Sequence, residues 1–592
     1  MEQSAKKKSL SRVLIVALIL ILGGGLLAHL IQTSGGVAVR DLRFMGIDSR
    51  LMSALLYVPK GVSKDKPAPG IVAMHGFLNS RETQDGFAIE FARRGYVVLA
   101  PDLLGHGYSE PALSTGQFFG SGIGGKPALE YLRSLDFVDK NNIGLEGHSF
   151  GAAGLIATAF ANPDSYRSIV VEGWSTGAYC PPGTPTFPRN MLVVFDKYDE
   201  FSKLSWGTPI ANDAPKGDKM KAVFGTTEPV EVGKLYGSIE KGTARKLLMP
   251  KTEHPYLHFS TEAIGDAVAW MQATLKGGNA IPPSDQIWYW KEIGTLIAMI
   301  GMILLLFPVG GYLLRTNYFK ELNEAPAPRK SLSGGGWWIG AVITILLPIP
   351  VYLWAWSFNK DMSKNSWLLP QVVTTHIMVW AVVVAAISLV LLILWHFLLN
   401  RKRGASFANY GLTWKNKGLQ LGKVGKSFLL ALIVVVAAYL TLAFSDWAFK
   451  TDYRLWVFAI KPMSVFHFGI FLRYLIPLAF YFLIIGMVIH GELRRHSGAW
   501  TQTVVNILLL IGGYVVFLMY QYIPLFAGGT LSRPDDNLAS IVMFQYIPIF
   551  TIVALVSTYF YRKTGHVFVG SFINAMLITW IIVAGTVTNY HF

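Results

Sequence analysis

Nine apolar runs, each close to the length of a helix that crosses a bilayer, constrain this chain more than any other feature. The first covers residues 13–31, and the other eight cover residues 287–314, 336–357, 372–399, 427–446, 470–490, 501–522, 540–561 and 567–588. A helical span needs about 20 mostly apolar residues, because a helix satisfies all its backbone hydrogen bonds internally. We therefore predict one anchor helix within residues 1–36 and an all-α transmembrane domain of about eight helices over residues 279–592.

The first apolar run has two interpretations. Lys6, Lys7, Lys8 and Arg12 precede it, which is also the arrangement of a cleaved signal peptide. However, the run is nearly of membrane length, and residues 27–29 make a poor small-residue cleavage site. We interpret the run as an uncleaved anchor, with a cleaved signal peptide as the alternative.

The basic residues indicate how the spans are oriented. The net charge is +16, but basic residues cluster between the apolar runs and not along one soluble face, so we expect no nucleic-acid partner. With the N-terminus inside, the inside loops carry Arg315, Lys320, Arg329, Lys330, Arg401, Lys402, Arg403, Lys415, Lys417, Lys423, Lys426, Arg494, Arg495, Arg562 and Lys563. The outside loops are poorer, with Lys360, Lys364, Lys450, Arg454, Lys461, Arg473 and Arg533. This alternation predicts a multi-pass protein of the cell membrane, surrounded by membrane lipids, with a cytoplasmic N-terminus and residues of about 33–286 outside.

The stretch between the first two spans reads as a separate domain over residues 37–278. It alternates short apolar runs with helix-like segments, which is typical of a mostly parallel sheet flanked by helices. The run at residues 71–74 ends in His75-Gly76, and the run at residues 96–100 ends in Pro101-Asp102. We therefore predict an α/β domain held outside the membrane.

A third strand-like run, residues 142–146, leads into Gly147-His148-Ser149-Phe150-Gly151. This is G-x-S-x-G between a predicted strand and a predicted helix, the context that a serine nucleophile requires. The glycines allow a sharp turn that holds the serine at its tip. The motif alone occurs often by chance, so its meaning depends on what accompanies it.

Further pieces accompany the motif in the expected chain order: His75-Gly76-Phe77, the segment 102–109, Asp199 and His254. With them, residues 37–278 resemble the α/β-hydrolase superfamily, close to its dienelactone-hydrolase-like and esterase- or lipase-like members. The resemblance covers less than half of the chain. It implies a triad of Ser149 as nucleophile, His254 as base and Asp199 as acid, with the N–H groups of Phe77 and Phe150 as the oxyanion hole.

Two of these roles have an alternative. Asp196 stands where the family usually has a glycine and could itself be the acid, although Asp199 fits the family position better. His258 follows His254 within the same loop, and the family places its base early in this loop, which favours His254. The alternative acid and base are therefore Asp196 and His258.

These features predict a membrane-anchored extracytoplasmic serine hydrolase that cleaves a small-molecule or lipid ester through an acyl-enzyme. The expected chemistry needs no cofactor and no metal, and no protein partner is indicated. A peptidase or acyltransferase would use the same triad. A transporter or sensor, in which the hydrolase domain only binds a ligand, is the alternative from another class.

Overall fold

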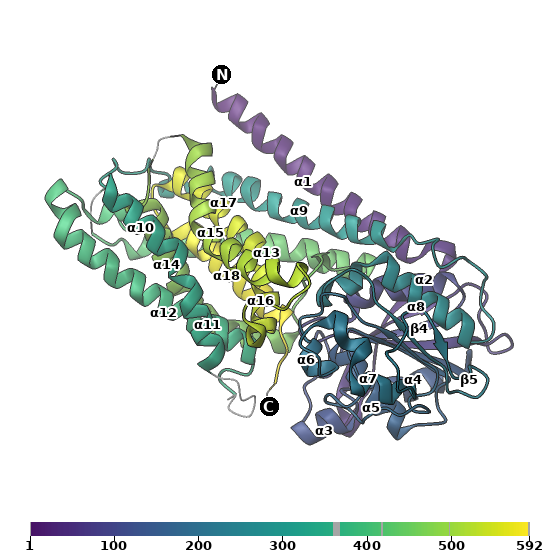
Figure 1. Ribbon diagram of the computed structural model, residues 1–592. Helices are drawn as coiled ribbons and strands as arrows, with labels where there is room; N and C mark the ends of the chain where they lie inside the picture. The colour runs from purple at the N-terminus through teal and green to yellow at the C-terminus, as the bar shows by residue number, and fades with distance from the viewer. Residues whose placement is uncertain (1, 359–366, 416–417, 496–497, 590–592) are drawn as a thin grey trace.

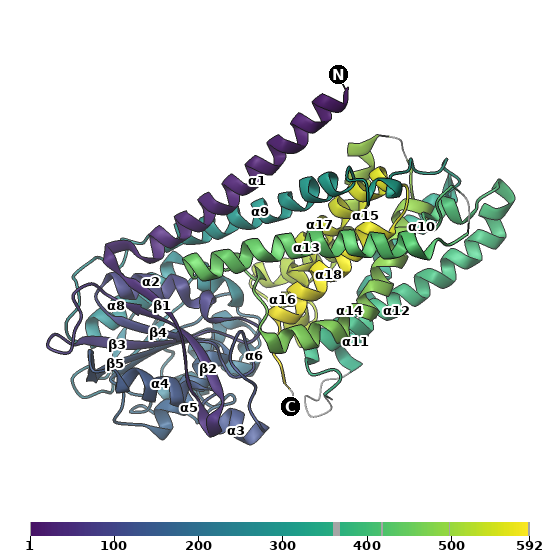
Figure 2. The same cartoon turned by 180° about the vertical axis from the view of Figure 1, so that it is seen from behind.

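The computed structural model describes residues 2–358, 367–415, 418–495 and 498–589, without the side chains of residues 2–8. Of the basic residues used for the orientation, Lys360, Lys364 and Lys417 lie outside the described residues, as do the side chains of Lys6, Lys7 and Lys8. The chain forms two parts. An α/β part lies at one end of a long helical part, as both views show (Figures 1 and 2).

The α/β part is built on a nine-stranded sheet in the order β1-β2-β4-β3-β5-β6-β7-β9-β8. The strands are β1 (Ala38–Met45), β2 (Leu51–Val58), β3 (Ala68–Met74), β4 (Val97–Pro101), β5 (Val138–His148), β6 (Ser168–Glu172), β7 (Met191–Val194), β8 (Leu235–Tyr236) and β9 (Arg245–Leu248). Pairing is parallel from β4 to β9 and antiparallel at the two edges. Parallel strands are covered on both faces, which explains their continuous apolar runs.

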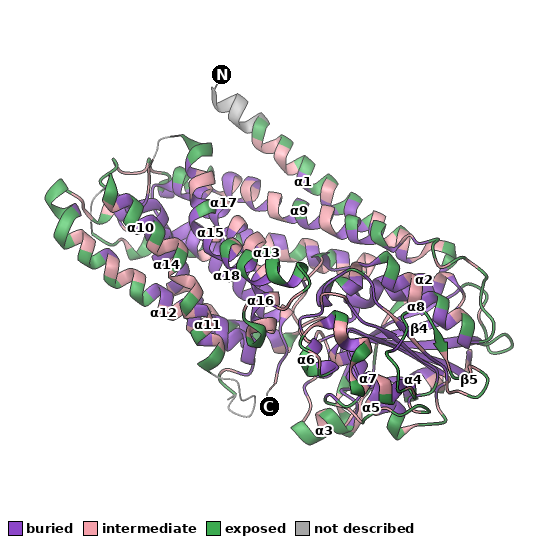
Figure 3. Ribbon diagram, viewed as in Figure 1, coloured by how far each residue is buried: buried purple, intermediate pink, exposed green. Residues whose placement is uncertain are grey.

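Helices cover both faces of this sheet, and each layer encloses its own core. Helices α4 (Gly125–Ser134) and α5 (Phe150–Ala161) pack with one face, and α2 (Asp85–Arg93) and α8 (Thr261–Thr274) with the other. The buried positions lie where these helices meet the strands (Figure 3). The predicted fold class, a mostly parallel α/β sheet fused to a helical part, is confirmed.

Nine helices of the described residues are long and apolar enough to cross a membrane, and each coincides with one predicted run. They include α1 (Glu2–Gln32), α9 (Trp288–Leu313), α10 (Gly335–Leu346) with α11 (Pro348–Phe358), α12 (Val372–Trp395), α13 (Leu421–Phe449), α14 (Val465–Met487), α15 (Ala499–Phe526), α16 (Asn537–Phe544) with α17 (Tyr546–Thr564), and α18 (Phe568–Gly585). The domain boundaries at residues 36 and 278 stay predictions.

Helices α1 and α9, which flank the α/β part in sequence, pack along each other. A Cβ on Gly24 would lie 2.5 Å from the carbonyl oxygen of Gly294, and one on Gly301 would lie 2.8 Å from that of Ala17. Small residues at such a contact let two helices approach closely, which is how helices associate where no water drives them together. The chain thus enters and leaves the α/β part through one helix pair.

Charged side chains from both parts meet where the α/β part touches the helices. Arg454, on the short strand β10 (Tyr453–Leu455) between α13 and α14, donates to Thr83 Oγ1 at 2.7 Å and to Ser80 Oγ at 3.1 Å. Its Nε donates to Asp452 at 2.8 Å. Lys291 of α9 pairs with the buried Asp85 of α2. The helical part therefore supplies the cations for buried acceptors of the α/β part.

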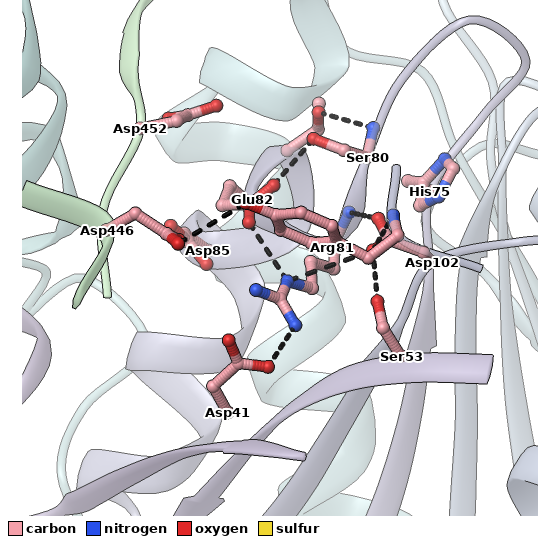
Figure 4. Close-up of polar contacts among 12 residues, drawn as sticks. Asp41, Ser53, His75, Ser80, Arg81, Glu82, Asp85, Asp102, Asp446 and Asp452 are labelled. Carbon is pink, nitrogen blue, oxygen red and sulfur yellow. Dashed lines mark hydrogen bonds and ion pairs between the residues drawn. The ribbon is translucent and has the colours of Figure 1, made fainter. Parts of the chain in front are cut away.

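Arg81 organises the side of this junction that belongs to the α/β part (Figure 4). Its guanidinium lies 2.6 Å from Asp41 and 3.0 Å from Glu82, while its backbone N–H donates to Asp102 at 2.9 Å. Burial alone would raise the pKa of Glu82, but Arg81 and Arg454 hold that pKa below its ordinary value. We name Arg81, Asp41, Glu82, Asp102 and Arg454, together with Lys291, Asp85 and Asp452, the junction network.

Replacing one cation of the junction network should destabilise the protein. Arg454→Met leaves Asp452 buried without its partner, which typically costs about 3–5 kcal/mol. We expect a lower midpoint of thermal unfolding in detergent. Arg40→Met, at an exposed position on β1, is the control and should change stability by less than about 0.5 kcal/mol. Equal midpoints for the two variants would contradict a stabilising role of the network.

Candidate active site

Ser149 lies at the turn between the end of β5 and the start of α5. Its backbone has φ 54° and ψ −118°, a strained conformation for a residue other than glycine. Its N–H donates to the carbonyl oxygen of Glu172 at 2.7 Å, and its own carbonyl accepts from the N–H of Ala153 at 3.1 Å. The surrounding sheet and helix thus hold the serine in the strained turn.

The two glycines of the motif are required by packing. A Cβ on Gly151 would lie 2.4 Å from the carbonyl oxygens of Met74 and His75. A Cβ on Gly147 would lie 2.9 Å from Leu155 Cδ1. Side chains at these positions would push α5 away from the strand ends, so the G-x-S-x-G pattern follows from the tight strand–turn–helix geometry.

A row of hydrogen bonds joins Ser149, His254 and Asp199. His254, the first residue of a 3₁₀ turn (His254–Phe259), places Nε2 2.8 Å from Ser149 Oγ and Nδ1 2.8 Å from Asp199 Oδ2. The N–H of Phe201 donates to the other oxygen of Asp199 at 2.7 Å. This is the geometry in which a base removes the proton of a serine while an acid orients the base.

Burial sets the protonation of this row. It lowers the pKa of His254 and raises that of Asp199, because each charged form would lose its hydration. In the neutral form that burial favours, His254 carries its proton on Nδ1, donates it to Asp199 and keeps Nε2 free to accept from the Ser149 hydroxyl.

The structure places the alternative acid and base outside this row. The Asp196 carboxyl is fully buried, and neither of its oxygens has a hydrogen-bond partner within the described residues. Burial and the nearby Asp199 raise the pKa of Asp196, which favours the uncharged form of its carboxyl group. The ring of His258 lies 4.0 Å from that of His148, and its Nε2 is 3.5 Å from Asn79 Nδ2.

Asp196, Asp199 and His254 also have the donor set of a small metal site. Their candidate ligand atoms lie within 4.8 Å of one another. However, both ring nitrogens of His254 already make hydrogen bonds, to Ser149 and Asp199. A cation here would replace at least one of these bonds, so the arrangement fits serine chemistry better than metal binding.

Ser149 opens into an apolar pocket of about 300 Å³. The α/β part lines it with Gly76, Phe77, Leu78, Asn79, Phe119, His148, Ser149, Phe150, Trp174, Tyr179, Phe201, Leu204, His254 and Pro255. Both proposed oxyanion residues, Phe77 and Phe150, are in this lining, with ring centroids 5.8 Å apart. The helical part completes the wall with Val457, Leu538, Ile541, Val542 and Gln545.

A second link joins the helical part to the row of Ser149, His254 and Asp199. Tyr522 of α15 donates to Glu200 Oε1 at 2.8 Å, and the N–H of His254 donates to the other oxygen of Glu200 at 3.0 Å. Sequence reasoning missed both Glu200 and Tyr522. Glu200 adjoins the predicted acid, but nothing in the sequence pairs it with a residue more than 300 positions away.

Comparison with known proteins agrees with the fold. Residues 71–274 match the alpha/beta hydrolase family. The quorum-quenching protein AidA of Acinetobacter baumannii (strain MDR-ZJ06) is 33% identical over 134 residues, which cover 22% of this chain and 42% of that protein. The chain thus spans less than half of the length of this relative.

Two solved esterase structures are also similar to the chain. A Pyrobaculum calidifontis esterase has 15% identity and a TM-score of 0.31, covering 45% of this chain and 92% of that one. A bacterial heroin esterase has 13% identity and a TM-score of 0.30, covering 41% and 86%. On its matching sequence and its parallel sheet, the segment 71–274 is an alpha/beta hydrolase domain, here joined to a large helical part of membrane type.

Proposed function

We propose that this protein is a membrane-anchored serine hydrolase that cleaves a carboxylic ester. The observation that carries the proposal is the continuous row from Ser149 Oγ through His254 to Asp199, at the wall of an apolar pocket. A serine hydroxyl is a weak nucleophile unless a base within hydrogen-bond reach takes its proton. The 2.8 Å contact with His254 Nε2 meets that requirement.

The reaction proceeds in two halves. Ser149 Oγ attacks the ester carbonyl as its proton passes to His254 Nε2, and the N–H groups of Phe77 and Phe150 stabilise the oxyanion. His254 then gives the proton to the leaving alcohol as the C–O bond breaks, which leaves Ser149 acylated. Water repeats the sequence and releases the acid and the free serine. Asp199 stabilises the imidazolium that forms in each half.

The same triad would serve a peptidase or an acyltransferase. In the first the leaving group is an amine, and in the second an alcohol or amine replaces water. The apolar pocket beside Ser149 favours an acyl ester over a polar peptide. A transporter or sensor that only binds ligand would have no need of the bonds that join all three residues.

We place the α/β part on the outer face of the membrane. The loops that the charge pattern assigns to the outside contact this part: Arg454 binds Thr83, and Asn537 donates to the carbonyl oxygen of Glu200 at 3.2 Å. Loops on the α/β side of the helices are thus those with fewer basic residues, which is the pattern of an extracytoplasmic face.

Cysteine labelling on intact cells tests this orientation. The sequence has one cysteine, Cys180, and Cys180→Ser removes it. In this background, Lys241→Cys adds an exposed thiol to the α/β part and Lys402→Cys adds one to a predicted inside loop. We expect a membrane-impermeant maleimide to label the first variant before lysis and the second only after lysis. The reverse pattern would contradict the proposed topology.

Fluorophosphonate labelling of the detergent-purified chain tests the proposed chemistry. The wild type should be labelled and Ser149→Ala should not, because the probe reacts only with an activated serine. A folded wild type that takes no label, or a Ser149→Ala variant that labels as well as the wild type, would contradict the proposed enzyme.

The same labelling separates the two candidate acids. Asp199→Asn loses the carboxylate that orients His254, and the labelling rate should fall by up to about 10⁴-fold. Asp196→Asn, a matched change at a buried carboxyl that makes no hydrogen bond to His254, should have a much smaller effect. A larger loss from Asp196→Asn would make Asp196 the acid.

A further inference from the structure

We infer that the helical part forms one wall of an acyl-binding pocket, and that the substrate is a long-chain acyl ester drawn from the bilayer. This inference rests on the proposed function, since it names the substrate class of the same site. It assigns a role in specificity to residues more than 300 positions away from Ser149.

The wall from the helical part has the periodicity of one helix face. Leu538, Ile541, Val542 and Gln545 line the pocket, and their spacing of three, four and seven residues is that of neighbours along one side of an α-helix. Helix α16 thus turns an apolar face with a single amide toward Ser149. Val457, from the hairpin of β10 and β11 (Phe458–Ile460), extends this surface.

The opposite wall is also apolar. The α/β part contributes the buried Trp174 and the partly buried rings of Phe77, Phe150 and Phe201. The polar lining groups on this side, Asn79, His148, Ser149 and His254, belong to the triad or to its neighbours. A pocket with reactive groups and otherwise apolar walls fits a carbonyl group attached to a hydrocarbon chain.

Polar contacts with the α/β part and with the helical part hold helix α16 in place. Asn537, the first residue of α16, donates to the carbonyl oxygen of Glu200. Three residues later in the same helix, Ser540 Oγ accepts from Gln521 of α15 at 2.8 Å. Helix α16 is therefore a fixed part of the pocket, fastened to the loop that carries the acid.

Exposed aromatic rings indicate the depth of the pocket relative to the lipid. Trp290 lies in the first turn of α9, Trp447 lies near the end of α13, and Tyr520 lies near the end of α15, with exposed fractions of 46%, 71% and 54%. These are the helix ends that meet the α/β part. Exposed Trp and Tyr at helix ends mark the boundary between lipid and water. The pocket thus lies at the level where a lipid presents its ester groups.

Chain-length selectivity of the full-length protein in phosphatidylcholine vesicles tests the inference. Ile541→Trp should fill the part of the pocket next to α16. We expect the ratio of kcat/KM for p-nitrophenyl dodecanoate to kcat/KM for p-nitrophenyl butyrate to fall at least about tenfold. Val516→Trp, at a lipid-facing position of α15 that is 61% exposed, is the matched control and should leave both values unchanged.

Equal values of the dodecanoate-to-butyrate ratio in wild type and Ile541→Trp would overturn the inference, provided that the variant still takes a short-chain fluorophosphonate. If Ile541→Trp does not fold, Leu538→Phe narrows the pocket at the same wall by a smaller volume. Its dodecanoate-to-butyrate ratio is then compared with that of the wild type in the same way. Cyclodextrin, which holds the long ester in water, should slow hydrolysis of the dodecanoate. An unchanged rate would overturn a bilayer source.

Failure of the proposed function would give a different result from failure of the acyl-wall inference. In that case the wild type would hydrolyse neither ester and would take no fluorophosphonate. A labelled wild type that hydrolyses butyrate but shows no effect of the α16 variants would retain the proposed enzyme and lose only the acyl wall.

Discussion

Charges buried between the α/β part and the helices are the constraint on which the rest of the structure depends. Arg81, Lys291 and Arg454 are each at most 1% exposed, and a buried cation is tolerated only beside anions and hydrogen-bond acceptors. Their partners come from both parts of the chain. The two parts therefore have one relative placement that satisfies these groups, and this placement brings α16 to the side of Ser149.

The triad depends on the same placement through Glu200. One carboxyl oxygen accepts from the Tyr522 hydroxyl and the other from the backbone N–H of His254. Burial raises the pKa of Glu200 to about 8, and the charge of Asp199 adds to this. Helix α15 thus helps to position the backbone of His254, the proposed base, so the helical part does more than hold the α/β part in place.

Local patterns in the sequence predicted the parts of the site that local geometry determines. Ser149 could be proposed because G-x-S-x-G follows a strand-like run, and the packing around Gly147 and Gly151 explains the pattern. The choice of Asp199 over Asp196 and of His254 over His258 rested on family resemblance, not on the residues themselves. In the structure, only Asp199 and His254 of these four lie in the bonded row. The nine apolar runs were readable because each is long and apolar enough to span a bilayer without help from the rest of the chain.

Contacts between distant segments could not be predicted from local sequence patterns. The wall of Leu538, Ile541 and Val542 looks in sequence like any apolar helix face, and only the fold decides whether such a face meets lipid, another helix or a pocket. The same holds for Tyr522, whose partner follows a strand more than 300 residues earlier. Pair contacts of this kind depend on how whole domains dock, and the sequence carries no periodic signal for them.

The most direct measurement of the central claim, a catalytic pocket shared by both parts, is a cryo-electron-microscopy structure of the chain after reaction with a dodecyl fluorophosphonate. Our account predicts phosphorus bonded to Ser149 Oγ and the alkyl chain lying against Leu538, Ile541 and Val542. An alkyl chain that runs along the α/β part alone, without touching α16, would contradict it.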